Sequence, residues 1–533
     1  MRNPLRAAFF FLLFLFSTFP FSSFASQEQN GDWIVTGSIG DAHTLIPILA
    51  SDSASSDITG LIFNGLVKYG PTLNLVGDLA ENWEIGKGGL EIIFHLRKNV
   101  RWHDGAAFTA EDVQFTYQKL IDPKVRTPYS SPFERIERLE ILDPYTVKVV
   151  YKEPYAPALE SWGMGILPKH LLEKEDLHKT DFARHPVGTG LFQFEEWRTA
   201  ERITLRPNPS YFEGKPRLGR YVYRIIPDQA TMFLELRTQG IDIMGLSPLQ
   251  YRRQTQGKFF EKNYRIFRYP AFAYTYVGFN LADPRFSDKR VRLAIDLAIN
   301  KQELIDGILL GLGKICTGPF PQESWAFNPE VPPTPYDPQK SRALLKEAGW
   351  SDQDGDGVIE KEGHPFEFTL ITNQGNDERK MAAEIIQRRL SEVGIRMKIK
   401  VIEWSAFISE FVDKRRFDAL LLGWSLGRDP DLYDIFHSSK TKEGEFNFIG
   451  YKNAEVDRLL EEGRGTFDQE KRKEIYHRLH ALLYEEKPYI FLWVPDSLPI
   501  VHSRFEGVKP APIGIGYNLR EWVVPQGKER YAK

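Results

Sequence analysis

The sequence predicts an α/β protein with more than one domain. The chain has 533 residues, which is more than a single hydrophobic core normally organises. Segment 366–402 has the order strand, helix, strand, because two apolar runs flank an amphipathic stretch from Asp377 to Val393 that stops at Gly394. Parallel strands joined by a helix need cover on both faces, which is typical of α/β domains.

The N-terminus has the features of a secretory signal peptide. Two arginines precede a short apolar run at 7–16, and small residues follow at Ser23 and Ala25. A run of this length is too short to span a bilayer comfortably. We therefore expect a signal peptide over residues 1–25 and a mature chain that starts near Ser26. An uncleaved membrane anchor is the alternative interpretation.

Further elements follow along the chain. Strands are predicted at 90–97, 192–194, 203–206, 221–226 and 418–424. Thr109, with Asp112 three residues later, predicts a helix start of the capping-box type, and Asp228 begins another helix. The strand at 418–424 is a continuous apolar run that leads into a loop, and ligands of open α/β sheets bind at the carboxyl ends of such strands.

The net charge and the cysteine content restrict the possible partners and the cellular location of the protein. The formal net charge is −3 and there is no basic stripe interleaved with aromatic residues, which argues against nucleic acid as a partner. The single cysteine, Cys316, cannot form an intrachain disulfide and lies far from the predicted cleavage site. No lipid-modified cysteine would then tether the N-terminus, so we expect a protein that diffuses freely in the periplasm between two membranes.

The motifs of common enzyme classes do not occur in the chain. There is no His-Glu-x-x-His, Gly-x-Ser-x-Gly, phosphate-binding loop or Cys-x-x-Cys sequence, and the 11 histidines are scattered. The segment Ser439–Lys442 matches Ser-x-x-Lys of penicillin-interactive enzymes without its companion motifs. We therefore expect a protein that is not an enzyme and that needs no cofactor.

An acidic turn is a weak candidate for a calcium site. Asp352, Asp354 and Asp356 occupy the first, third and fifth positions of a calcium-loop pattern, with glycine at the sixth. The twelfth position is Gly363 instead of the usual glutamate, so the closing bidentate ligand is missing. We therefore expect an Asp/Gly-rich turn without a metal, and a calcium site is the alternative.

Several ordered motifs resemble the bacterial extracellular solute-binding proteins of family 5, the dipeptide- and oligopeptide-binding proteins and their relatives. The matching segments are 79–83, 94–97, 100–105, 108–113, 187–190, 208–212, 279–280 and 348–350. The resemblance covers essentially the whole mature chain, and an ordered set of motifs is a stronger signal than any one of them.

The resemblance implies a two-lobed periplasmic-binding-protein-like fold of class II type with an extra subdomain. By family topology we expect the first lobe at 26–60, 186–268 and 498–533, the extra subdomain at 61–185 and the second lobe at 269–497. Such a protein would close over its ligand at a hinge and present the closed form to a membrane transporter.

The same resemblance implies a monomeric receptor that captures peptides and delivers them to the inner-membrane permease of an ABC importer. In peptide-binding relatives the segment after the buried strand supplies a tryptophan wall and an aspartate for the ligand's amino group. The candidate ligand-binding residues here are Trp424, Leu426, Gly427, Asp429 and Asp431. The expected place of the aspartate falls near Leu426 or Gly427, and Asp429 lies further along, so amino-terminal anchoring stays open. A receptor for oligosaccharides or another small polar solute is the alternative function, and a periplasmic hydrolase is a remote one.

Overall fold

The computed structural model describes residues 31–531 of the chain. The predicted signal peptide and the cleavage point near Ser26 therefore lie outside the described residues. Among the helices of residues 31–531, none is long and apolar enough to cross a membrane.

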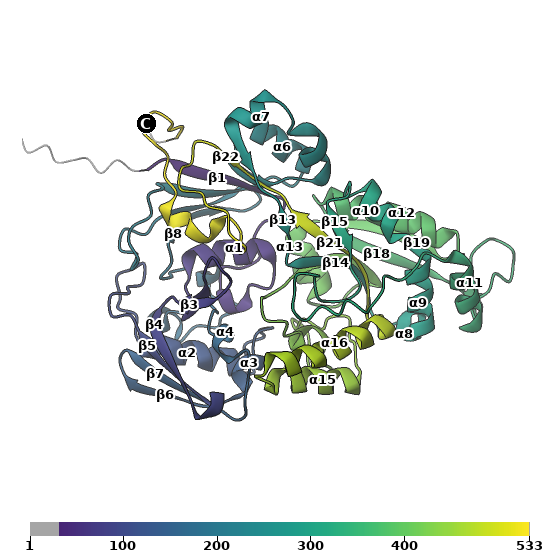
Figure 1. The fold of residues 1–533 in the computed structure, drawn as a ribbon, viewed down its shortest axis with the longest axis horizontal. Coiled ribbons are helices and arrows are strands. Elements are labelled where there is room, and N and C mark those ends of the chain that lie inside the picture. The colour runs from purple at the N-terminus through teal and green to yellow at the C-terminus, as the bar shows by residue number, and fades with distance from the viewer. Residues whose placement is uncertain (1–30, 532–533) are drawn as a thin grey trace, which may run out of the picture. The chain divides into compact units, whose positions relative to one another are not determined.

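A first sheet of seven strands contains segments from distant parts of the chain (Figure 1). Its strands, in spatial order, are β12 (Tyr264–Ile266), β22 (Pro499–His502), β11 (Ile243–Gly245), β1 (Trp33–Ser38), β10 (Arg220–Ile225), β9 (Arg202–Pro207) and β8 (Phe192–Arg198). Strand β1 is parallel to β10 and β11, and the other neighbours are antiparallel. The last strand of the chain, β22, thus lies inside this sheet, between β12 and β11.

A second sheet of seven strands is formed by one continuous stretch of the chain. Its strands are β13 (Tyr269–Pro270), β21 (Tyr489–Ser497), β14 (Ala273–Phe279), β20 (Ala419–Ser425), β18 (Glu367–Asn373) and β19 (Arg396–Ile402), with β15 (Gly313–Ile315) paired to β21. Strand β18 is parallel to β19 and to β20. Helix α12 (Asp377–Ser391) connects β18 to β19, so the predicted strand–helix–strand unit is confirmed.

A smaller antiparallel sheet forms the extra subdomain. It contains β4 (Ala80–Gly86), β5 (Glu91–Leu96), β7 (Thr146–Tyr151) and β6 (Ile136–Asp143), and α2 (Ala110–Ile121) packs beside β6 and β7. The predicted capping box is present, because Thr109 Oγ1 accepts from the Glu111 N–H and the Asp112 carboxylate accepts from the Thr109 N–H at 3.0 Å. Two short hairpins join β2 (Val67–Tyr69) to β3 (Leu75–Gly77) and β16 (Glu360–Lys361) to β17 (His364–Pro365).

The remaining α-helices are distributed along residues 31–531. They are α1 (Ser53–Ile62), α3 (Ser131–Glu134), α4 (Ala158–Ser161), α5 (Lys169–Leu172), α6 (Gln229–Arg237), α7 (Lys258–Asn263), α8 (Pro284–Ser287), α9 (Lys289–Ala298), α10 (Lys301–Gly307), α11 (Pro338–Glu347), α13 (Trp404–Ala406), α14 (Tyr433–Phe436), α15 (Ala454–Gly465) and α16 (Gln469–Glu486). The predicted helix after Asp228 is α6, whose first turn is capped by the Asp228 carboxylate accepting from the Thr231 N–H.

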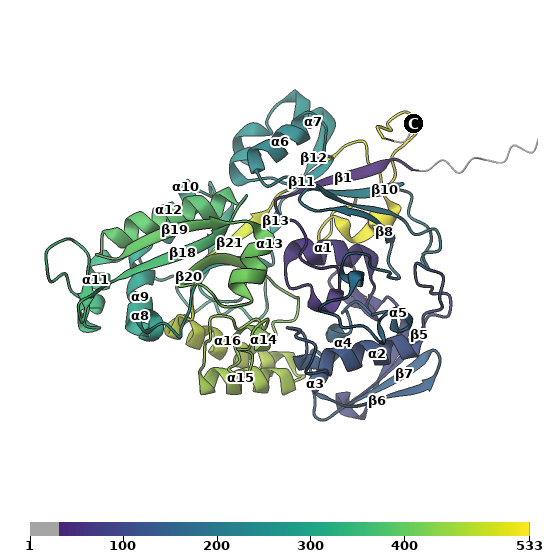
Figure 2. The ribbon, with the colours of Figure 1, turned by 180° about the vertical axis from the view of Figure 1, so that it is seen from behind.

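The central strands β14, β20 and β21 of the second sheet are buried on both faces along most of their length, which explains why β20 is a continuous apolar run in the sequence. Along β20, Ala419 and Leu421 join one hydrophobic cluster with residues of α9 and α12. Their neighbours Leu420 and Leu422 join another cluster with residues of α15 and α16, and the two pairs of helices lie apart from each other (Figure 2). Alternation of side chains along a strand therefore supplies both clusters from one sequence.

The chain passes between the two large sheets twice, at 267–268 and at Leu498. The two passages lie side by side, because β13 pairs with β21 just beyond them and the Ala271 N–H donates to the Pro495 carbonyl at 3.0 Å. The second sheet is therefore attached to the first by two adjacent extended segments, which is the arrangement of a hinge.

Candidate functional site

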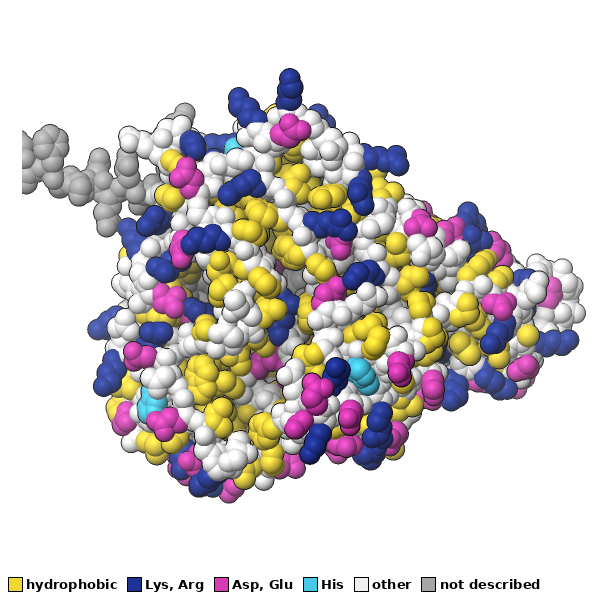
Figure 3. Space-filling view, in the orientation of Figure 1, with side chains coloured by type: hydrophobic (Ala, Val, Ile, Leu, Met, Phe, Trp, Pro, Cys, Tyr) yellow, Lys and Arg dark blue, Asp and Glu magenta, His cyan; other side chains and the backbone are white. Residues whose placement is uncertain are grey.

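A cavity of about 810 Å³ is lined by segments from both large sheets. The N-terminal half of α1 contributes from the first sheet's side, and β14, the end of β20 and the start of α12 contribute from the second. Figure 3 shows the molecule hollowed near the middle of one face, with hydrophobic and charged side chains around the hollow. Its volume lies within the range of about 300–1,000 Å³ that is usual for small-molecule sites.

The end of β20 forms one wall of this cavity, as the sequence predicts for the carboxyl end of a strand. The predicted ligand-binding residues all line it: Trp424, Leu426, Gly427, Asp429 and Asp431. The Trp424 ring stacks on Phe448 at 5.8 Å between centroids and meets the edge of Phe446 at 5.2 Å. Its indole N–H donates to Tyr489 Oη at 3.4 Å, so the ring is held from behind and presents a face to the cavity.

Asp429 and Asp431 each pair with a buried arginine. Arg472 donates to both Asp429 oxygens, at 2.5 and 2.7 Å. Arg464 donates through Nε to both Asp431 oxygens, at 2.9 and 2.8 Å. Burial favours the neutral acid of Asp431, but the Arg464 charge outweighs it and lowers the pKa of this carboxyl. The two predicted carboxylates therefore already serve as counter-charges within the wall.

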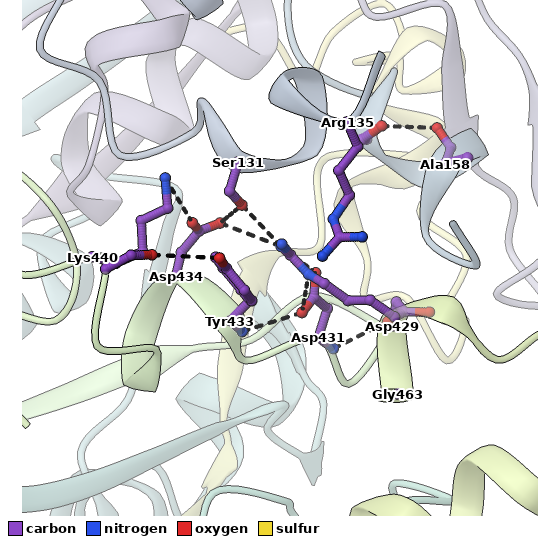
Figure 4. Close-up of polar contacts among 12 residues, drawn as sticks. Ser131, Arg135, Ala158, Asp429, Asp431, Tyr433, Asp434, Lys440 and Gly463 are labelled. Atoms are coloured by element: carbon purple, nitrogen blue, oxygen red, sulfur yellow. Dashed lines mark hydrogen bonds and ion pairs between the residues drawn. The ribbon is translucent and has the colours of Figure 1, made fainter. Parts of the chain in front are cut away.

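Polar contacts tie this wall to the extra subdomain (Figure 4). Ser131, at the start of α3, donates to Asp434 Oδ2 at 2.9 Å and accepts from Arg464 at 2.9 Å. Lys440 donates to Ser130 Oγ at 3.2 Å. We call these contacts of Ser130 and Ser131 with Asp434, Lys440 and Arg464 the latch. Because its members come from opposite sides of the two chain passages, the structure has the arrangement of a closed form.

Arg379 is a cavity residue that sequence reasoning missed. Among the described residues that line the cavity it is the only lysine or arginine. It lies in the first turn of α12 and donates to Asn373 Oδ1 at 2.7 Å. Burial lowers the pKa of Arg379 to about 10, so the guanidinium is still charged at pH 7. The signal was its position directly after β18, at the carboxyl end of a parallel strand.

Three further carboxylates of the cavity carry no sequence motif. They belong to Asp52 and Asp57 of the α1 region and to Asp413, which follows the π-helical turn Phe407–Val412. Trp404, also a cavity residue, donates from Nε1 to Asp52 Oδ1 at 3.1 Å, which joins α1 to the second-sheet side.

The acidic turn lies outside the cavity wall. Asp352, Asp354 and Asp356 come together with Glu360, with one carboxylate oxygen of each within 4.8 Å of the others. Glu360 was missed because only the first, third, fifth and twelfth positions of the loop pattern were considered, whereas Glu360 stands at the ninth, a further ligand position, at the start of β16. Most of these carboxylates are exposed and already accept backbone N–H groups of the turn.

Two lobes joined by adjacent passages and enclosing a cavity define a two-lobed solute-binding protein, and the predicted α/β fold with an extra subdomain is confirmed. The family model of the bacterial extracellular solute-binding proteins, family 5 (middle), matches residues 74–446, and the chain belongs to this family. This is a family of solute-binding proteins, not of enzymes.

Relatives extend the match over nearly the whole chain. The oligopeptide-binding protein AppA of Bacillus subtilis (strain 168) is 35% identical over 509 residues, covering 93% of this chain and 92% of AppA. The structure of AppA in complex with a nonapeptide has a TM-score of 0.89 at 33% identity, covering 93% of this chain and 100% of that chain. The structure of NikZ from Campylobacter jejuni in complex with Ni(L-His) has a TM-score of 0.84 at 28% identity, and the match covers 92% of this chain and 99% of that chain. The structure of DppA from Helicobacter pylori in complex with peptide STSA has a TM-score of 0.83 at 28% identity, and the match covers 93% of this chain and 99% of that chain.

Proposed function

We propose that this protein is the peptide receptor of an ABC importer, which encloses its ligand between two lobes and delivers it unchanged to a membrane permease. The observation that carries the proposal is a cavity of about 810 Å³ that is lined from both sheets and has the latch across its edge. Relatives with this fold bind a nonapeptide or peptide STSA. A ligand enclosed in this way is shielded from water and stabilises the closed form through contacts that the open form lacks.

The chemistry of the cavity suits a peptide. Arg379 provides a cation for a ligand carboxylate, and the wall is otherwise acidic. Aromatic faces such as that of Trp424 give broad apolar contact without demanding one side chain. A zwitterionic peptide could therefore pair its carboxylate with Arg379, and its side chains could pack on aromatic surfaces that do not require one particular side chain.

We further propose the division of the chain into a first lobe of 26–60, 186–268 and 498–533, an extra subdomain of 61–185 and a second lobe of 269–497. The membership of the strands supports it, since the first sheet takes β1, β8–β12 and β22 and the second takes β13–β15 and β18–β21. The two passages at 267–268 and Leu498 would then be the hinge.

The setting that we propose is the periplasm, with an N-terminus near Ser26, a monomeric protein and an inner-membrane permease as partner. Osmotic shock followed by N-terminal sequencing tests the location. Recovery only in membranes, with Met1 retained, would contradict it.

Extraction of the ligand that co-purifies with the protein, followed by mass spectrometry, tests the function itself. We expect intact peptides, which fresh protein rebinds without chemical change. NikZ uses this fold for Ni(L-His), so the fold alone does not select peptides. Recovery of oligosaccharides would favour the alternative receptor, and cleavage products formed from added peptides would favour a hydrolase.

A further inference from the structure

Three aspartates among the described cavity residues have no basic partner. Asp52 caps α1 from the preceding residue, Asp57 lies on the same helix, and Asp413 comes from the second lobe. Within residues 31–531 none of the three forms an ion pair. We call Asp52, Asp57 and Asp413 the acidic trio.

The other aspartates of the cavity wall are compensated. Asp429, Asp431 and Asp496 each pair with an arginine, at 2.5, 2.7 and 2.6 Å respectively. Asp434 lies 3.8 Å from Arg464 and 3.9 Å from Lys440. Arg379 belongs to a different element, the start of α12, and bonds Asn373. Among the described aspartates of the wall, only the acidic trio therefore lacks a basic partner. The two cavity glutamates each accept a neutral donor instead, Glu378 from Gln229 at 3.3 Å and Glu445 from the Lys442 N–H at 2.7 Å.

Asp52 supplies an independent sign of a missing donor. The residue is only 4% exposed. Its Oδ1 accepts from the Ser55 N–H at 3.0 Å and from Trp404 Nε1 at 3.1 Å. Its Oδ2 is buried and has no hydrogen-bond partner among the described residues. A buried carboxylate oxygen without a donor is costly, so it needs a donor from the protein, from an ordered water or from a bound ligand.

The trio also carries electrostatic strain. Burial, followed by the charge of Asp52, raises the pKa of Asp57 to about 6. Burial raises the pKa of Asp413 to about 7, with the charges of Asp52 and Glu443 adding to the rise and Lys414 opposing it. The Asp57 side chain is exposed to the solvent of the cavity, but protein surrounds the cavity at this point, and this surrounding protein raises the pKa of the carboxyl. Closure brings charges of one sign together across the two lobes, which is unfavourable unless a cation or protons compensate them.

Aromatic rings adjoin the trio. Trp404 lines the cavity and bonds Asp52, and Tyr129 lines it with its hydroxyl tied to the Ala50 carbonyl at 2.7 Å. Carboxylates and aromatic faces together are the usual surroundings of a bound organic cation.

We propose that Asp52, Asp57 and Asp413 form a subsite for a cationic group of the ligand, an ammonium or a guanidinium. The inference rests on the proposed function and deepens it: the preferred peptides carry a positive charge at their amino terminus or on a lysine or arginine side chain. Because the trio spans both lobes, the cation also offsets the repulsion that closure creates and so couples charge recognition to closing.

Calorimetry with four probe peptides tests the subsite. The probes are Ala-Ala-Lys-Ala and Ala-Ala-norleucine-Ala, each with a free and with an acetylated amino terminus. We expect the wild type to bind a probe carrying the recognised cation about ten- to a hundredfold more tightly than the doubly neutral probe. Loss on acetylation identifies the amino terminus as the source of the cation, and loss on the norleucine change identifies the side chain.

Variants assign the preference to the trio. Asp57→Asn and Asp413→Asn should each reduce it severalfold or more, and Asp52→Asn keeps a good helix cap while removing the charge. Asp377→Asn, a matched change of an exposed carboxylate that does not line the cavity, should leave the preference unchanged. A wild type that binds all four probes equally, or a preference that Asp377→Asn reduces as much as the changes in the trio do, would overturn the subsite.

Two readouts separate this inference from the proposed function. Without ligand, Asp57→Asn should raise the melting temperature, because it removes repulsion with Asp52 of the same helix region, and an unchanged or lower value would argue against the trio. If no probe binds, the charge of the co-purified ligand decides. A co-purified ligand that is cationic but not a peptide would support the subsite and contradict the proposed peptide function. A ligand that is uncharged or anionic would contradict the subsite.

Discussion

At the scale of single residues, Asp429 is a carboxylate with two competing roles. Both of its oxygens accept from Arg472, whose side chain is 7% exposed. We predict that Asp429→Asn lowers the free energy of unfolding by about 2–4 kcal/mol, because it leaves a buried guanidinium without its counter-charge. Urea denaturation measures this change.

Binding by the same variant separates the structural role from the sequence-based hypothesis of an amine anchor. An anchor requires a loss of about ten- to a hundredfold for a free peptide and none for its N-acetylated form. Trp424→Ala serves as the comparison, because it removes wall area and should weaken both forms alike. Equal binding of both forms by the wild type and by Asp429→Asn would leave Asp429 as the partner of Arg472 alone.

His480 predicts how stability depends on pH. Its Nδ1 accepts from the Asn328 N–H at 3.1 Å, and Nε2 lies 3.1 Å from Thr317 Oγ1. Burial lowers the pKa of His480 to about 4 from the ordinary 6.5. As the pH falls the unfolded chain takes up the proton first, so the stabilisation is complete above pH 6.5 and is lost towards pH 4. The expected loss is on the order of 3 kcal/mol.

Denaturant titrations between pH 4 and pH 7 test this prediction. His480→Gln should flatten the profile, while the exposed control His364→Gln should not change it. A wild-type profile with the same slope as that of His480→Gln would show that the ring is not kept neutral by the fold.

Among cavity residues, sequence reasoning found those of one continuous segment and missed the rest. Trp424 and Asp429 follow an apolar strand, so local pattern and the resemblance pointed to them. Asp52 and Asp413 come from distant parts of the chain and meet only because the two lobes close on each other. The spacing of residues along the chain does not show which distant residues meet in the fold. A carboxylate without a basic partner can therefore be recognised only when the residues around it are known.

At the scale of elements, the acidic turn before β16 gives a clear expectation for calcium. Asp352, Asp354 and Asp356 accept backbone N–H groups, Asp356 also bonds Arg396 at 3.3 Å, and Glu360 accepts from the Gln353 N–H. These internal partners and the missing twelfth ligand predict weak or no calcium binding.

Calorimetry with calcium should therefore reveal no submicromolar site. Glu360→Gln is a useful companion, because it removes the carboxylate at the ninth position, the fourth acidic member of the cluster. Submicromolar affinity in the wild type that Glu360→Gln abolishes would contradict the prediction and would identify the ninth position as the decisive ligand.

Regular elements were predicted well where their pattern is local. The strand–helix–strand unit around α12 and the capping box at Thr109 are confirmed at nearly the predicted residues. Periodicity could not show which strands are neighbours, because pairing such as that of β22 with β11 joins segments that are remote in sequence. The two-lobed arrangement therefore came from the family resemblance and not from the residues alone.

At the scale of the whole molecule, the latch predicts how closure contributes to affinity. Ser131→Ala removes a donor to Asp434 and an acceptor for Arg464. We expect ligand affinity to fall about three- to tenfold, because the closed form loses about 1 kcal/mol of hydrogen bonding that the open form never had. Stability without ligand should change little.

Calorimetry and small-angle X-ray scattering, with and without ligand, measure this effect. Ser161→Ala is the matched control, since the Ser161 hydroxyl donates to the Ala158 carbonyl of its own helix at 2.8 Å and has no part in the latch. If Ser131→Ala binds and contracts with ligand as Ser161→Ala does, the latch does not distinguish the closed form from the open form.

The position of β22 inside the first sheet has a consequence for the order in which the protein folds. Strands β11 and β12 have been synthesised by residue 266, yet the strand that separates them begins only at Pro499. Arg504, just beyond it, supplies the buried counter-charge of Asp242. During synthesis the first lobe must wait for the whole second lobe to emerge, and such contacts between distant segments form slowly. The first sheet of a nascent chain therefore stays incomplete until Pro499–His502 has been synthesised, so β11 and β12 remain without their shared partner strand for most of synthesis.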